Sequence, residues 1–423
     1  MSGLKALWSH PRLRFFQDSL LMLCASVGGG VFTMLTNIAT WHFLQKNALD
    51  DYTTLTALRD TLTQFTIPVM GVQTAFAQLA AKHAPEVDPS PVSGALRGQM
   101  RWLAVYWLGV AALMLAFQPS IGKTFKVGDP AKLWIGWGYG WLLLLTPAFF
   151  GVIQGRQNFK GYAIAKVSGD VGILVAVTLV TGFILPNATG AIGGLGLGAL
   201  LSFLVVTFLT RRDWSAAPAP FEIWKFLKHF IPLTAGVGVI TYMFTADILV
   251  VQRYFAEGSA PYAAARTLGK AVIFLVAPVS LAMFPSIARS AARSEETPVL
   301  GQALGITTAV GCCAALACTL FPEFLLGILF PNASDMGAAQ LVPLFAWRFL
   351  PLAIASLLIN NLLARERYAV VPWMLLVPLS YSITLHYWHP SRRSVIQTLG
   401  WHSLAVLVLL VFFTWRETRP KRA

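Results

Sequence analysis

The stretch FTADILVVQRYFAEGSAPYAAARTLGKAVIFLVAPVSLAMFP, residues 244–285, decides the fold because two membrane-spanning apolar runs in it contain charged residues. Asp247 lies in the first run, and Arg266 and Lys270 lie in the second, four residues apart and therefore on one face of a helix. A charge near the centre of a bilayer costs about 2.5 to 3.5 kcal/mol on insertion scales. The stretch therefore predicts two transmembrane helices whose charged face lines a water-filled cavity that binds an anion.

The rest of the chain has the composition of an integral membrane protein. Of its 423 residues, 56% are hydrophobic and 12% are charged, whereas soluble proteins carry about 25% charged residues. Apolar runs of membrane-spanning length recur along the chain. We predict an all-α polytopic membrane protein of about 12 transmembrane helices, with both termini cytoplasmic and with single helices over 52–81 and 229–255.

The net charge of +14 follows this topology. Of the 32 Lys and Arg residues, 21 lie in predicted cytoplasmic segments, seven in outer loops and four within helices. An excess of positive charge on the cytoplasmic side is typical of membrane proteins. The basic composition therefore indicates membrane orientation, and we expect no nucleic-acid partner.

The two halves of the chain repeat at a spacing of 210 residues. We predict an N-lobe of six helices over residues 1–210, a cytoplasmic linker over 211–228 and a C-lobe of six helices over 229–423. Because six is even, both repeats enter the membrane from the same side, so the lobes should be related by a pseudo-two-fold axis along the membrane normal. The corresponding pairs are Asn37 with Asp247, Tyr52 with Tyr262, and Pro68 with Pro278.

Charged residues inside the predicted helices form the candidate site. A diphosphate suits such a site because Arg offers a planar fork of donors and Lys a compact charge. An alternative is that the charges neutralise one another as structural pairs between helices. No catalytic or metal-binding spacing occurs, so we predict neither an enzyme nor a metal site. The predicted substrate-binding residues are Arg59, Arg266, Lys270 and Arg348. The predicted counter-charge or ion-coupling residues are Asn37, Asp60 and Asp247.

The opening stretch also resembles helices 7 and 8 of polysaccharide exporters. This family is a part of the multidrug/oligosaccharidyl-lipid/polysaccharide (MOP) exporter superfamily, and the branch that the chain resembles is the Wzx-type O-antigen flippases. The resemblance implies two six-helix lobes around a V-shaped cleft, with a cationic cavity for an undecaprenyl-diphosphate-linked saccharide. The residues that carry it are Ala246–Val251, Tyr254-Phe255, Tyr262–Ala265, Pro278–Ser280 and Phe284–Ile287, together with Gln154–Gln157 in the first half.

We therefore predict a flippase that moves a polyprenyl-diphosphate-linked oligosaccharide across the bacterial inner membrane by alternating access, in O-antigen and lipopolysaccharide biosynthesis. The expected partners are this undecaprenyl-diphosphate-linked oligosaccharide and membrane lipids, with a polysaccharide polymerase or glycosyltransferase as a candidate protein partner. We expect no cofactor, and H⁺ or Na⁺ as the candidate coupling ion. A multidrug cation antiporter of the same fold is the first alternative, although cations outnumber carboxylates within the helices. A membrane enzyme acting on lipid-linked sugars is the second, although the outer loops are short for acid/base chemistry.

Overall fold

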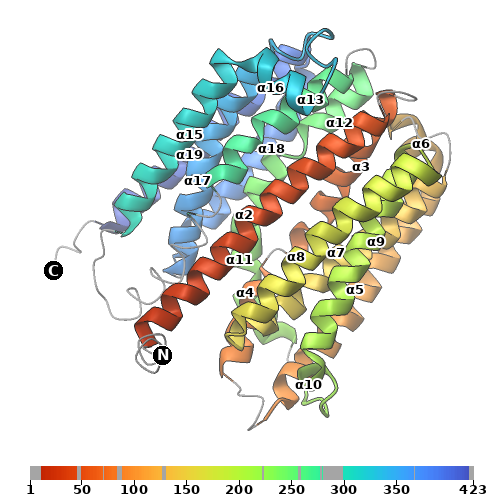
Figure 1. Ribbon diagram of the computed structural model, residues 1–423. Coiled ribbons are helices and arrows are strands. Elements are labelled where there is room, and N and C mark those ends of the chain that lie inside the picture. Colours follow the sequence, from red (N-terminus) through yellow and green to blue (C-terminus); the bar gives the residue numbers. More distant parts are fainter. Residues whose placement is uncertain are drawn as a thin grey trace, which may run out of the picture.

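The computed structural model describes residues 11–44, 49–69, 71–82, 88–125, 130–221, 223–255, 259–276, 279, 299–365 and 367–418 (Figure 1). Within these ranges all regular structure is helical, which confirms the predicted fold class. Nine helices of the described part are long and apolar enough to cross a membrane. The three other places in a twelve-helix, two-lobe bundle are occupied by α2 (Pro11–Leu44), by α3 (Leu49–Phe65) together with α4 (Val72–Lys82), and by α13 (Ser259–Gly269).

The first group of helices belongs to the N-terminal half. Close packing within it depends on small residues: a Cβ at Gly198 would lie 2.3 Å from the backbone of Ile173, so glycine lets the backbones of α8 and α9 approach. Its elements are α2 (Pro11–Leu44), α3 (Leu49–Phe65), η1 (Ile67–Val69), α4 (Val72–Lys82), α5 (Ser90–Ala116), α6 (Gln118–Phe125), α7 (Ala131–Gly155), α8 (Phe159–Leu179), the π-helical turn η2 (Val180–Ile184) and α9 (Ala188–Leu209).

The second group follows the short helix α10 (Arg211–Trp214). Both α10 and the start of α11 (Ile223–Met243) fall within the predicted linker 211–228. The predicted linker is therefore partly helical, so helical structure does not mark where one lobe ends and the other begins, and the lobe boundaries at 210 and 229 stay predictions. Pro278 and the run Phe284–Ile287 lie outside the described residues. The elements of this group are α11 (Ile223–Met243), α12 (Asp247–Tyr254), α13 (Ser259–Gly269), α15 (Val299–Leu320), α16 (Pro322–Leu329), α17 (Val342–Ala364), η3 (Tyr368–Val370), α18 (Val371–Tyr387) and α19 (Arg392–Thr418).

Two helices that the sequence predicts as single are interrupted. The predicted helix 52–81 is divided among α3, η1 and α4, with Pro68 in the interruption, and proline lacks the N–H that a continuous helix requires. The predicted helix 229–255 ends as α11 at Met243 and resumes as α12 at Asp247. The expectation of uninterrupted helices is therefore wrong at both places, and the second interruption positions the candidate site.

The two groups meet along α3, whose neighbours in the second group include α12 and α13. The helices α3 and α13 begin at residues 49 and 259, which is the spacing of the sequence repeat. In Figure 1, α6, α12 and α16 lie at one end of the bundle, here named the α16 end, and α10 lies at the other, the α10 end. The predicted topology places the α16 end outside the cell.

An aromatic seal joins the two groups near the α16 end. We define it as Trp41, Tyr52 and Phe330, three buried side chains. The Trp41 ring centroid lies 5.0 Å from that of Tyr52 and 5.7 Å from that of Phe330, both edge to face. Trp41 Nε1 also donates a hydrogen bond of 2.9 Å to the carbonyl oxygen of Pro331, which belongs to the second group. These contacts hold the two groups together at this end.

Candidate functional site

The interruption between α11 and α12 builds the centre of the site. Its residues 244–246 leave the regular helix, and the carbonyl oxygen of Phe244 accepts a hydrogen bond of 2.6 Å from Arg266 Nη2. Backbone groups freed inside a membrane protein need such partners, because no lipid atom can replace them. Asp247 follows as the first residue of α12, where the helix dipole stabilises a carboxylate.

Arg266 is the most constrained residue of the site. It is fully buried, and its Nε donates to both carboxylate oxygens of Asp247 at 2.9 Å. Arg266 Nη2 lies 2.8 Å from Asp247 Oδ1, and Arg266 Nη1 lies 2.6 Å from Asp60 Oδ2. Tyr262 donates a further hydrogen bond of 2.8 Å to Asp247. The guanidinium is therefore held by two carboxylates and one carbonyl, as a buried charge requires.

Asp60 connects the two groups of helices. It lies on α3 in the first group, and its Oδ2 also accepts a hydrogen bond of 3.3 Å from Lys270 Nζ, which follows α13 in the second group. One carboxylate thus serves two cations of the opposite half. Residues 60 and 270 are equivalent positions of the 210-residue repeat, and equivalent positions of a two-fold pair can touch only near the axis. The pseudo-two-fold axis therefore passes close to this ion pair.

Arg59 provides the third cation. Its Nη1 donates a hydrogen bond of 2.9 Å to Asn37 Oδ1 on α2, and within the described ranges Arg59 forms no ion pair. Asn37, Arg59 and Lys270 are partly exposed, whereas Asp247 and Arg266 are fully buried. The exposed part of the site therefore carries the cations whose charges are least neutralised.

These six residues, listed at the end of this paragraph, form what we name the charged cluster. Its three cations outnumber its two carboxylates, so it carries one net positive formal charge. Chemically it can bind an anion through Arg59 and Lys270 while Arg266 stays paired. The cluster consists of Asn37, Arg59, Asp60, Asp247, Arg266 and Lys270.

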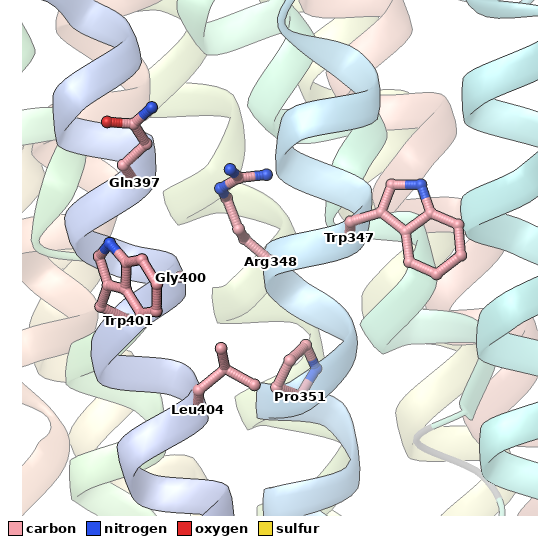
Figure 2. A pocket seen from close by; sticks show the side chains of 7 residues that line it. All are labelled: Trp347, Arg348, Pro351, Gln397, Gly400, Trp401 and Leu404. Carbon is pink, nitrogen blue, oxygen red and sulfur yellow. The ribbon is translucent and has the colours of Figure 1, made fainter.

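The seventh predicted residue, Arg348, lies elsewhere. It lines a separate pocket between α17 and α19 (Figure 2) and has no contact with the charged cluster among the described residues. Two groups of the site, the Tyr262 hydroxyl and the carbonyl of Phe244, have no predicted role in the sequence. The repeat pairs Tyr262 with Tyr52, but the repeat does not indicate that Tyr262 donates a hydrogen bond to Asp247.

No protein-family model matches the chain, and no curated protein matches its sequence. Its fold does match solved structures. An inward-facing multidrug resistance MATE family transporter of the MOP superfamily aligns with a TM-score of 0.72 at 10% identity, over 90% of this chain and 94% of that one. The eukaryotic MATE transporter AtDTX14 aligns with a TM-score of 0.70 at 14% identity, over 95% and 96%.

The lipid II flippase MurJ in an inward closed conformation aligns with a TM-score of 0.69 at 15% identity, over 96% of this chain and 88% of that one. At such identities the likeness shows the fold alone. The chain therefore has the MOP-superfamily fold that these MATE transporters and MurJ share, as the resemblance implies, while the Wzx branch stays a prediction. The named structures are transporters or flippases, not enzymes.

Proposed function

We propose that the protein is an alternating-access flippase that moves a polyprenyl-diphosphate-linked oligosaccharide across the bacterial inner membrane, from the α10 end to the α16 end. The observation that carries the proposal is the charged cluster, which places one excess positive charge between two groups of helices in a transporter fold. An uncompensated intramembrane charge is costly and marks a substrate or ion site. The polyprenyl tail would stay in lipid, and the headgroup alone would enter.

Arg59 and Lys270 would bind the diphosphate. Both are partly exposed, and neither has a carboxylate of its own: Arg59 binds an amide oxygen, and Lys270 shares Asp60 with Arg266. Charge-assisted bonds from a guanidinium and an ammonium suit phosphate oxygens. Arg266 would act differently from the sequence prediction. Its guanidinium is fully buried and its charge is already paired with Asp60 and Asp247, so we assign it to positioning Asp60 and the start of α12.

The cluster also suggests how binding would change the conformation. Asp60 links α3 to Lys270 and Arg266 across the two groups. A diphosphate carries more negative charge than one carboxylate and would compete with Asp60 for Lys270. Loss of this ion pair would remove a cross-lobe contact from the present conformation, and a ligand shifts an equilibrium by such differential interactions. Substrate binding would thereby favour separation of the lobes at the α16 end.

The cation-antiporter alternative fits the cluster less well. An organic cation needs a carboxylate that is free to bind it, whereas Asp247 is fully buried against Arg266 and Asp60 is shared by two cations. The net positive charge would repel such a substrate.

Native mass spectrometry of the purified protein would test the proposal. We would offer undecaprenyl-diphosphate-linked sugar against tetraphenylphosphonium, a lipophilic cation, to the wild type and to the double variant Arg59→Gln/Lys270→Gln. Loss of two charge-assisted contacts should weaken diphosphate binding by at least about ten-fold. Arg253→Gln is the matched control, because Arg253 is an exposed arginine on α12 and its loss should leave binding unchanged.

Flipping of a fluorescent polyprenyl-diphosphate sugar in proteoliposomes gives the second readout. The double variant should lose flipping while its thermal stability stays within a few degrees of the wild type. Preferred binding of tetraphenylphosphonium, or flipping by the double variant at the wild-type rate, would refute the proposal.

A further inference from the structure

The pocket around Arg348 is separate from the charged cluster and has no assigned role. It is a hollow of about 380 Å³ between α17 and α19. Figure 2 shows the Arg348 side chain extending from α17 into the gap towards α19, on which Gln397 and Trp401 also line the pocket. Trp401 is 70% exposed on a helix long and apolar enough to cross a membrane. The pocket therefore opens towards lipid.

Arg348 lacks an anionic partner in the described part of the chain. Its one hydrogen bond is a long contact of 3.4 Å from Nη1 to the carbonyl oxygen of Leu344, one turn earlier in the same helix. Arg266, by contrast, is held by two carboxylates. An arginine within a membrane helix normally pairs with another group or faces water. Arg348 therefore presents an unneutralised guanidinium to whatever fills the pocket.

The approach of α19 gives the guanidinium its position. A Cβ at Gly400 would lie 2.6 Å from Arg348 Cγ, so only glycine lets the arginine stem lie against the α19 backbone. The polar end then reaches the level of Gln397, whose amide is the second polar group of the pocket. The pocket thus combines a fixed cation and an amide with an apolar wall.

The same pair of helices carries more positive charge at the α16 end. Arg348 lies six residues after the start of α17, which is about 9 Å along the helix axis. A second hollow of about 280 Å³ lies at the head of the same two helices, lined in part by Gln340, Arg392 and Arg393. Arg393 Nη2 donates to Gln340 Oε1 at 2.9 Å. Basic residues therefore occur at two depths, near the membrane surface and below it.

The Arg348 pocket and the second hollow lie along the same two helices, and we name them together the α17–α19 groove. We propose that this groove binds an anionic phospholipid of the leaflet at the α16 end, with Arg348 and Gln397 contacting the phosphate group. A lipid-facing opening selects a lipid over a soluble anion. The unpaired guanidinium binds a phosphate group, and it favours a headgroup with a net negative charge over a zwitterionic one, whose own ammonium group repels the guanidinium. The arginines at the head of the groove strengthen the attraction of anionic lipid to this surface. The site is distinct from the charged cluster, and the proposal does not rest on the proposed flippase function.

Native mass spectrometry with phosphatidylglycerol and phosphatidylcholine would test the site. The wild type should retain phosphatidylglycerol in preference to phosphatidylcholine, and Arg348→Gln should lower that preference by about ten-fold. Arg348→Lys should keep most of it, since the charge remains. Arg253→Gln, at an exposed arginine outside the groove, should keep all of it. Equal preference in the wild type and Arg348→Gln would overturn the proposal.

Two further measurements keep the result decisive. Gln397→Leu removes the second polar group and leaves Arg348 in place, so it should weaken phosphatidylglycerol binding several-fold. This variant tests the site independently of Arg348→Gln, including the case in which Arg348→Gln cannot be purified. Unchanged phosphatidylglycerol binding in Gln397→Leu would count against the site. Undecaprenyl-diphosphate sugar should neither displace phosphatidylglycerol nor lose binding in Arg348→Gln. Mutual displacement would show that the groove is a substrate site instead, and failure of the flippase proposal alone would leave the phosphatidylglycerol preference intact.

Discussion

Replacement of Arg266 by methionine separates structural from substrate-binding roles in the charged cluster. Arg266→Met removes the cation that pairs with the fully buried Asp247. Of the contacts described above, Asp247 then keeps only the hydrogen bond from Tyr262. Asp60 keeps its second cation, Lys270, at 3.3 Å. Removal of one partner of a buried ion pair costs about 3 to 5 kcal/mol. Unfolding entropy of about 2.1 cal/mol/K per residue gives roughly 0.9 kcal/mol/K for this chain, so Tm should fall by about 3 to 6 °C. Helices that persist after unfolding in detergent would lower this entropy and enlarge the shift.

The assay is thermal unfolding of the purified variants in one detergent at one pH. Asp247→Asn added to Arg266→Met removes the unpaired buried carboxylate, and this double variant should recover at least half of the loss. Arg253→Met, at an exposed position of α12, should change Tm by less than 1 °C. A loss below 1 °C in Arg266→Met, or no recovery on adding Asp247→Asn, would refute the assignment of Arg266 as a positioning residue.

Three other changes probe the contacts between helices. A double-mutant cycle of Asp60→Asn and Lys270→Met should give a coupling free energy of about 1 to 3 kcal/mol in thermal unfolding, and independent effects would contradict the cross-lobe ion pair. Trp41→Phe removes a hydrogen bond worth about 1 kcal/mol, so amide exchange in the loop between α16 and α17 should accelerate about five-fold; an unchanged rate would show that the seal does not depend on this bond. A Cβ at Gly151 would meet a carbonyl oxygen of α4 at 2.3 Å, so Gly151→Ala should lower the free energy of unfolding by about 1 to 3 kcal/mol. The control is Gly109→Ala, which should be tolerated because the space around Gly109 is open. Equal Tm values for both variants would contradict the packing of α4 on α7.

Much of the charged cluster could be predicted because its signals are local or periodic. The spacing of Arg266 and Lys270 places them on one helix face, and the repeat relates Lys270 to Asp60. The structure brings these residues together with Asp247. The spans themselves were predictable because lipid allows few alternatives to apolar helices.

The interruption at residues 244–246 could not be predicted. This segment contains neither glycine nor proline, and the donor that binds the freed carbonyl, Arg266, lies 22 residues further along the chain. The position of Arg348 was equally hidden. The neighbour that a helical residue faces can be predicted when the helix has a single apolar stripe, because that stripe marks the side turned towards the core. The helix α17 has apolar residues on all sides and packs against α11, α13, α15 and α19, so its sequence does not show which of these helices Arg348 faces.

The ion pair between Asp60 and Lys270 has a consequence for the history of the chain. If the two halves arose by duplication of a six-helix ancestor that paired with itself, that ancestor placed this position against its own copy. An aspartate there would have met an aspartate and a lysine a lysine, and like charges in contact repel. A self-paired ancestor could therefore hold neither residue comfortably. Only after the two copies could differ in sequence could one side become acidic and the other basic, so this salt bridge records an asymmetry that a homodimer could not encode.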